Sequence, residues 1–280
     1  MKVTFLPDGI HHVEAHTQYP DTEAGTWQEH PEVFDDEGLL VMSVGSFLIQ
    51  TPEHNVLVDA GFGPGRVDIG AITAGAFRGD LIGGEMLESL ATVGLTPEDI
   101  DGIVLSHLHL DHVGWIPSPS DAKSPTFPNA RYFMDTRELA YWVGETDPLE
   151  RAKGASDEQI NLIRRALTTT DGEADIFPGI RVIPTPGHTF GHVSVLAHSD
   201  EGRVLVLGDA LHCPVELQHR GMAFVFDHDA EQATASRAMI EKLLHEPDTY
   251  FAGGHFPNKV FGRLADGDAL HTHALHYIHD

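Results

Sequence analysis

The chain has little of three things: cysteine, basic residues and long apolar runs. Its one cysteine, Cys213, excludes an internal disulfide and a CxxC site, as expected for a reducing compartment. No apolar run approaches the roughly 18 residues that span a bilayer. The first residues, MKVTFLPDGIHHVEAH, contain proline, aspartate and histidine where a secretory signal needs an apolar stretch. We therefore predict a cytoplasmic location and no membrane partner.

Basic residues are outnumbered by acidic ones. Seventeen lysines and arginines against forty-three aspartates and glutamates give a formal charge of -26. Such a surface repels a nucleic-acid backbone, so nucleic acid is not an expected partner. With 41% hydrophobic residues, a chain of this length can bury a substantial core. We predict a single domain over residues 1–280, with a homodimer as a candidate assembly.

Histidine, by contrast, is abundant, and it clusters in the stretch SHLHLDH at residues 106–112. Twenty histidines in the chain make chance clustering an alternative to a site. An apolar run directly before the stretch predicts a short buried strand. In extended backbone the rings of His107 and His109 point to the same side, and Asp111 and His112 follow as the chain turns. Four side chains can therefore converge on one pocket.

Three further candidate ligands stand just past an apolar run, each beside a glycine that lets the backbone come close. They are His188 after the strand predicted at residues 181–183, Asp209 after the strand at 204–207, and His255 after the run at 250–252. This joint pattern repeats too regularly for composition alone. Five histidines and two aspartates form a nitrogen and oxygen ligand set that suits zinc, iron, manganese or cobalt. The residues by themselves thus predict a metal site.

The rest of the chain has the pattern of strands with interleaved helices and no internal repeat. Two segments lack a clear period: a glycine-rich segment at 61–84, interpreted as a long loop or insertion that could hold a substrate lid, and a proline-rich loop at 117–128. We predict further strands at 39–49, 55–59, 103–105, 130–134 and 193–197, and helices at 85–93, 136–143, 156–167 and 229–244.

The motifs together resemble the metallo-β-lactamase superfamily. HxHxDH stands at 107–112, PGHTxGH at 186–192, GD at 208–209 and GH at 254–255. With Val58-Asp59-Ala60-Gly61 before the first motif, the resemblance covers roughly residues 40–256. It implies an α/β fold, a four-layer αββα sandwich in which two sheets lie between outer helices and the metal site lies at one edge between the sheets.

The resemblance also implies a cofactor of two divalent metal ions, zinc first, with iron, manganese or cobalt as alternatives. Two cations about 3.5–4 Å apart lower the pKa of a shared water, and the resulting hydroxide attacks a carbonyl or phosphoryl centre. Asp111 could then carry the proton to the leaving group. Asp59 would orient a ligand histidine through a hydrogen bond. By the same resemblance His107, His109 and His188 hold the first metal, Asp111, His112 and His255 hold the second, and Asp209 bridges both.

Within the superfamily, the surroundings of the motifs look most similar to the quorum-quenching N-acyl homoserine lactonases and to enzymes like methyl parathion hydrolase. In many of these lactonases a tyrosine three residues after the bridging aspartate touches the substrate carbonyl, and His212 stands there in this chain. We predict a metal-dependent hydrolase that opens a lactone or a related small ester by attack of a metal-bound hydroxide. Asp111 and His212 are its catalytic candidates.

Three alternatives stay open. The same site could serve an organophosphate or aryl ester hydrolase, or a hydroxyacylglutathione hydrolase. A persulfide dioxygenase would hold a single iron with His107, His188 and Asp209, and the remaining motif residues would only support these ligands. Metal stoichiometry and substrate preference separate these hypotheses.

Other features of the sequence are interpreted as structural. Gly61–Arg66 resembles the start of a dinucleotide-binding motif but lacks its third glycine. Four apolar residues could wall a substrate pocket, although core packing is the commoner role of such side chains: Phe62, Phe77, Met86 and Trp115. Two groups of histidines are interpreted as solvated or packed residues without a role in the site: His11, His12 and His16 near the N-terminus, and His271, His273, His276 and His279 near the C-terminus.

Overall fold

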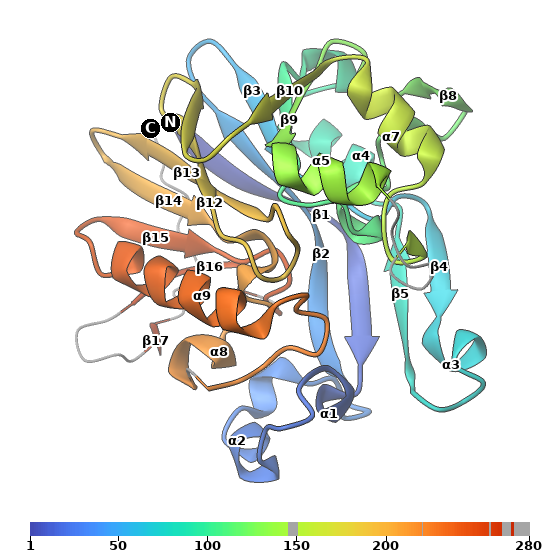
Figure 1. Cartoon of the computed structure of the whole chain (residues 1–280), viewed down its shortest axis with the longest axis vertical. Coiled ribbons are helices and arrows are strands. Elements are labelled where there is room, and N and C mark those ends of the chain that lie inside the picture. The colour runs from blue at the N-terminus through green and yellow to red at the C-terminus, as the bar shows by residue number, and fades with distance from the viewer. Residues whose placement is uncertain (145–150, 220, 258, 265–269, 272–280) are drawn as a thin grey trace.

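The first sheet contains the hairpin that the sequence predicts at residues 39–59. β2 (Leu40–Gln50) and β3 (Asn55–Val58) pair antiparallel and are joined by a short turn. The computed structural model describes residues 1–144, 151–219, 221–257, 259–264 and 270–271. Within them this sheet has the order β10-β9-β6-β3-β2-β1-β5-β4 (Figure 1). Its other strands are β1 (Lys2–Val13), β4 (Gly65–Asp68), β5 (Gly79–Gly83), β6 (Gly102–Val104), β9 (Arg131–Asp135) and β10 (Leu167–Thr170).

The second sheet is formed by the C-terminal half of the chain. Its order within the described residues is β11-β12-β13-β14-β15-β16-β17. The three strands predicted around residues 181–183, 193–197 and 204–207 are present, although the third ends one residue early. The bounds are β11 (Ala174–Phe177), β12 (Ile180–Pro184), β13 (Val193–Ser199), β14 (Gly202–Val206), β15 (Thr249–Ala252), β16 (Phe261–Leu264) and β17 (Leu270–His271).

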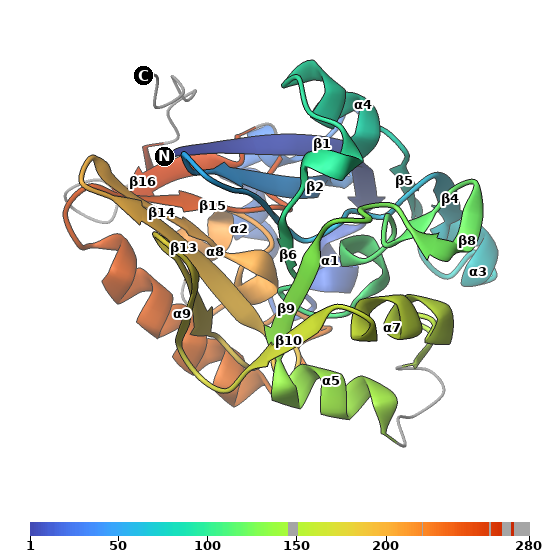
Figure 2. The same cartoon turned by 90° about the horizontal axis from the view of Figure 1, so that it is seen from above.

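Each sheet buries apolar side chains on both of its faces, and this gives the molecule four layers. In β2 and β3, Ile49 and Val56 belong to the core between the two sheets, whereas Leu48 and Leu57 belong to the core beneath the outer helices. This alternation follows from the strand period of two residues. The helices over the first sheet are α4 (Met86–Thr92), α5 (Thr136–Val143) and α7 (Asp157–Arg164), and α9 (Ala230–Leu244) covers the second (Figures 1 and 2). The predicted αββα sandwich is therefore confirmed.

Side-chain caps set where the two predicted longer helices begin. Ser156 Oγ accepts a hydrogen bond from the Gln159 N–H at the start of α7, and Asp229 caps α9 in the same way. The prediction that the first of these helices continues to residue 167 was wrong, because Leu167 pairs with Tyr132 as the first residue of β10. The short helices are α1 (Ala15–Gln18), α2 (Ala24–Gln28), α3 (Ile69–Ile72), α8 (Val215–Gln218) and the 3₁₀ turns Pro31–Val33, Pro97–Asp99, Leu110–His112 and Gly208–Ala210.

Two segments predicted as loops carry strands. Between residues 61 and 84, β4 and β5 pair with each other, and β5 extends the sheet beyond β1. Glycine permits this pairing, because a Cβ at Gly79 would lie 2.0 Å from the His12 carbonyl oxygen. The proline-rich segment contains a small antiparallel pair, β7 (Pro117–Ser118) and β8 (Asp121–Pro125). In the first of these segments, pairing with the distant strand β1 overrode the weak local pattern, whereas β7 and β8 form a local hairpin.

The N-terminal strand β1 was not predicted either. Pro7, Asp8 and Gly9 interrupt its apolar pattern, and the pairing with β2 shifts register between Pro7 and Gly9. The Asp8 carboxylate is buried and accepts five hydrogen bonds, among them those of the Gly63 N–H and the Trp115 indole N–H. Asp8 therefore fastens β1 to the loops after β3 and after the histidine cluster.

The structure describes one of the four C-terminal histidines: His271 lies in the short strand β17, and the other three lie outside the described residues. In the part of the chain that is described, no helix is both long and apolar enough to cross a membrane.

Candidate metal centre

Each predicted ligand lies in a loop that directly follows a strand. β3, β6 and β9 run parallel in the first sheet, as do β14 and β15 in the second, so the loops after them meet at one edge. The ligands follow these strands in this way: His107 to His112 after β6, His188 after β12, Asp209 after β14 and His255 after β15.

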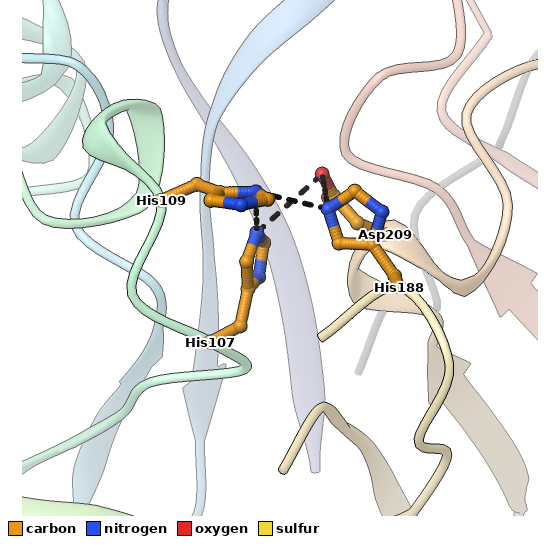
Figure 3. Close-up of side chains that lie close together, drawn as sticks. All are labelled: His107, His109, His188 and Asp209. Atoms are coloured by element: carbon orange, nitrogen blue, oxygen red, sulfur yellow. Dashed lines mark hydrogen bonds and ion pairs between the residues drawn. The ribbon is translucent and has the colours of Figure 1, made fainter. Parts of the chain in front are cut away.

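Four side chains form the first group of candidate ligands (Figure 3). His109 Nδ1 lies 2.9 Å from His107 Nε2 and 3.0 Å from His188 Nε2. Asp209 Oδ2 lies 3.7 Å from His107 Nε2 and 3.4 Å from His188 Nε2. One N–H on His109 could donate to only one of the two neighbouring rings. The convergence of three ring nitrogens and a carboxylate oxygen is the arrangement expected around a cation.

The second group consists of Asp111, His112 and His255, and it faces the other oxygen of Asp209. Asp209 Oδ1 lies 3.2 Å from His112 Nε2 and 3.3 Å from His255 Nε2. Asp111 Oδ2 lies 3.5 Å from His255 Nε2. Because its two oxygens face different groups, Asp209 has the geometry of a bridging ligand.

The donor atoms fit divalent cations. Ligand nitrogens about 2.0–2.1 Å from zinc are about 3.3 Å apart in a tetrahedron, and the distances in the two groups scatter around this value. His112 Nε2 and Asp209 Oδ1 are buried and have no hydrogen-bond partner among the described residues. Buried polar atoms without partners are costly, which indicates that another group satisfies them.

Burial and charge divide the ligand histidines into two kinds. Burial lowers the pKa of His107, His109 and His188 well below the ordinary value, so these rings are neutral, as metal ligation requires. Burial also acts to lower the pKa of His255, but Asp209 and Asp111 outweigh it and raise this pKa to about 9. A proton therefore competes with a cation for the lone pair of His255.

Comparison with known proteins agrees with this geometry. The sequence profile of the metallo-β-lactamase superfamily matches residues 40–255. The chain belongs to this superfamily. An N-acyl homoserine lactonase of Bacillus sp is 26% identical over 230 residues, which cover 78% of this chain and 82% of the relative.

Solved structures show the same fold. The dizinc quorum-quenching lactonase AidC, in complex with a product, superposes with a TM-score of 0.78 at 24% identity, covering 93% of this chain and 89% of AidC. The hydrolase AbOPH of the β-lactamase superfamily has a TM-score of 0.74 at 25% identity, covering 98% of this chain and 94% of its own. The chain is thus a hydrolase of the metallo-β-lactamase superfamily.

In this member of the metallo-β-lactamase superfamily the predicted partner of a candidate ligand histidine is present. Asp59 Oδ2 accepts a hydrogen bond from His112 Nδ1 at 2.9 Å, and its carboxylate also accepts from the backbone and hydroxyl of Ser106, each at 2.7 Å. Asp59 has a φ of 65°, a conformation that L residues rarely adopt. The three hydrogen bonds hold Asp59 in this strained backbone conformation. In this conformation its carboxylate joins the end of β3 to the first motif.

We predict that Asp59→Asn weakens metal binding. The asparagine keeps the shape but removes the charge that fixes the His112 ring, and loss of such a partner costs about 10- to 100-fold in metal affinity. Titration of the metal-loaded protein with a chelator measures the change. Asp36→Asn is the matched control, because Asp36 is exposed. An affinity equal to that of the control variant would show that Asp59 does not orient His112.

Three buried residues that support the ligands were missed by sequence reasoning. His192 Nε2 accepts the backbone N–H of Asp209 at 2.9 Å, while its Nδ1 lies 2.8 Å from Thr185 Oγ1. Asp227 Oδ1 lies 3.5 Å from His188 Nδ1. Glu138, on α5, contacts the loops of both histidine motifs. The second GH of PGHTxGH could have pointed to His192; for the two acids the sequence holds no such signal.

A cavity of about 250 Å³ opens beside the ligands. None of the four apolar residues considered as pocket walls lines this cavity. Met86 and Trp115 are buried in the core, Phe77 is exposed, and Phe62 is not among the lining residues. His11, which the sequence led us to interpret as solvated or packed, lines this cavity and has a buried ring nitrogen. The other lining residues besides the metal ligands are Gln18, Met42, Val67, Ile69, Leu81, Leu110, Lys153, His212, Phe224 and Phe226.

The structure places His212 against the first group of ligands. Its ring stacks on Phe224 with centroids 3.6 Å apart, and its Nε2 lies 3.4 Å from Asp209 Oδ2. Both ring nitrogens are buried and have no hydrogen-bond partner among the described residues. The backbone N–H of His212 donates to Glu216, which holds the loop. His212 is therefore an imidazole that is held in a fixed position in the wall of the cavity.

Proposed function

We propose that this member of the metallo-β-lactamase superfamily is a dinuclear lactonase that opens N-acyl homoserine lactones or related small esters. The observation that carries the proposal is the pair of ligand groups sharing Asp209 beneath a cavity with mainly apolar walls. A hydrophobic pocket with a few convergent polar groups suits a small, largely apolar substrate. The similarity to a Bacillus lactonase supports the same substrate class.

Different residues would hold the cations, contact the substrate and transfer a proton. His107, His109 and His188 would hold one cation, Asp111, His112 and His255 the other, and Asp209 both. Two divalent cations, zinc first, supply Lewis acidity and a water of lowered pKa when bound. His212 faces the cavity beside Asp209, where it can donate a hydrogen bond to the substrate carbonyl. Asp111 also lines the cavity, so its carboxylate can pass a proton to the leaving oxygen.

The second ligand group favours two metals over one. A mononuclear iron centre would need only His107, His188 and Asp209, and would give no reason for the approach of His112 and His255 to Asp209 Oδ1. An organophosphate or aryl ester hydrolase would use the same seven ligands, as would a thioesterase acting on hydroxyacylglutathione. The cytoplasmic location, the single domain and the homodimer stay predictions.

Metal counting and a substrate panel test the proposal. We expect two zinc ions per chain in the reconstituted protein, and a higher kcat/KM for acyl homoserine lactones than for paraoxon-type esters and acylglutathiones. A preference for the thioester or the phosphotriester would replace the lactonase assignment by the corresponding alternative. One iron per chain with production of sulfite would overturn the hydrolase mechanism.

We predict that His212→Phe lowers kcat. Phenylalanine can keep the stack on Phe224 but cannot donate a hydrogen bond, and loss of one such donor costs about 10²- to 10³-fold in kcat. His212→Tyr restores a donor and should recover much of the rate. His16→Phe, at an exposed position, is the control. Equal rates for the wild type and the phenylalanine variant would remove His212 from the mechanism.

A further inference from the structure

One row of side chains crosses four strands and forms a wall of the cavity. His11 on β1 pairs with Met42 on β2 and with Leu81 on β5, and Leu81 pairs with Val67 on β4. All four residues line the cavity. The row leads away from the sheet centre, where the ligand loops lie, toward the edge strand β4. Three of its members are apolar and His11 is the exception.

His11 presents a buried polar atom to this wall. Its Nε2 has no hydrogen-bond partner among the described residues. The ring lies close enough to Asp111 and His255, two of the candidate metal ligands, for electrostatic interaction with both. A buried nitrogen that no protein group satisfies is costly, and a ligand atom can remove that cost.

The neighbouring histidine on the same strand has no such role. His12 Nδ1 lies 2.8 Å from Asp80 Oδ1, and His12 does not line the cavity. Successive side chains of a strand point to opposite faces, which separates the two rings. The contrast shows that histidines of this segment do not in general lack a hydrogen-bond partner. The unsatisfied nitrogen is found on His11, the histidine that lines the cavity.

We propose that His11 binds the substrate through Nε2, by a hydrogen bond to a polar group beside the reacting carbonyl, while the apolar chain beyond that group lies along Leu81 and Val67. Neighbouring strands are about 4.8 Å apart, so the row offers about 10 Å of apolar wall beyond His11. This inference rests on the proposed lactonase function and narrows its substrates. They are lactones or esters that carry an amide, hydroxyl or keto group next to the reacting carbonyl, followed by an apolar tail.

Two lactones that differ in the polar group test the proposal. One is N-hexanoyl homoserine lactone, and the other is a γ-lactone with an alkyl chain of equal length and no amide. His11→Leu should lower kcat/KM for the amide substrate by about 10- to 100-fold and leave kcat/KM for the alkyl lactone unchanged. His11→Gln, whose amide reaches the position of Nε2, should restore the preference for the amide substrate. His12→Leu, the same change on the other face of β1, should leave the preference as in the wild type.

Two measurements besides turnover distinguish a loss of substrate binding by His11 from a disturbance of the metal centre. Metal content should be the same in the wild type and both His11 variants, and the ring-opened product N-hexanoyl-homoserine should bind the leucine variant more weakly by a similar factor. Equal losses on both lactones, or no loss on either, would overturn the role of His11 while the lactonase function stands. Failure of the metal-loaded wild type to open either lactone would overturn the lactonase function, and the role of His11 with it.

Discussion

Asp209→Ala is expected to abolish both metal loading and turnover. The two carboxylate oxygens of Asp209 face different groups of candidate ligands, at 3.4 Å from His188 Nε2 and at 3.2 Å from His112 Nε2. In the proposed dinuclear centre its removal would take a ligand from each cation and leave the buried histidines without their shared negative charge. Since metal catalysis supplies several kcal/mol of barrier lowering, we expect kcat/KM to fall by about 10³-fold or more.

Metal analysis and kinetics on the same preparation check this expectation. Asp200→Ala is the matched control, because Asp200 is exposed in the turn between β13 and β14 and the same atoms are deleted. The control should bind metal and turn over substrate as the wild type does. Circular dichroism of the Asp209 variant shows whether the fold survives. Retained activity in a folded Asp209→Ala protein would refute the bridging role.

Glu138→Gln is expected to weaken metal binding and stability together. The carboxylate is fully buried, and each of its oxygens accepts two hydrogen bonds. Oε1 accepts from the Leu108 N–H and the Trp142 indole N–H, and Oε2 from the Thr189 hydroxyl and the Gly191 N–H, at 2.7 to 3.0 Å. Leu108 lies between two ligand histidines, and Thr189 follows His188. Glu138 therefore ties both histidine loops to α5.

Glutamine fits the same space but cannot satisfy the same partners. Turned one way, its NH₂ group faces the N–H groups of Leu108 and Trp142; turned the other way, it still faces the Gly191 N–H, although the Thr189 hydroxyl can rotate to accept. Each buried donor left unsatisfied costs about 1–3 kcal/mol. We expect the free energy of unfolding to fall by about 2–6 kcal/mol and metal affinity to fall by about 10- to 100-fold, as for other groups that orient ligands. Urea unfolding and chelator competition measure the two quantities.

Glu88→Gln on α4 is the control for this change, because Glu88 is exposed. It should unfold and bind metal as the wild type does. A Glu138→Gln variant that loses stability but binds metal with unchanged affinity would show that Glu138 supports the fold without positioning the ligands. The two measurements on one variant thus separate the roles.

Several buried carboxylates hold the loops of the candidate ligands in place. Asp59, Glu138 and Asp8 each accept three or more hydrogen bonds from loops that contain or adjoin the ligands. Buried charges are stable only when they are paired or hydrogen-bonded in this way. The loops of the centre are therefore fixed to α5, β1 and β3 independently of any cation, so the site is preorganised for metal binding.

The seven candidate ligands and the positions of β2, β3, β6, β9, β12, β13 and β14 could be predicted from the sequence. The ligand types are rare in combination, they follow apolar runs, and their spacing within 107–112 and 186–192 is local. The hairpin of β2 and β3 and the capped helices α7 and α9 are likewise coded by neighbouring residues. Local periodicity and caps carry this information because their interactions span only a few residues.

The strand β1, the pairing of β4 with β5 and the two supporting acids Glu138 and Asp227 could be found only in the tertiary structure. Glu138 meets its partners in the two histidine loops across 30 to 53 residues of sequence, and His11 interacts with Asp111, a candidate ligand a hundred residues further along the chain. Neither contact leaves a pattern in its own neighbourhood. The sequence by itself determined which chemistry the centre performs, because ligand types and their local spacing specify it. The walls of the cavity were decided by long-range strand pairing, which sets His11 in register with Met42 and Leu81.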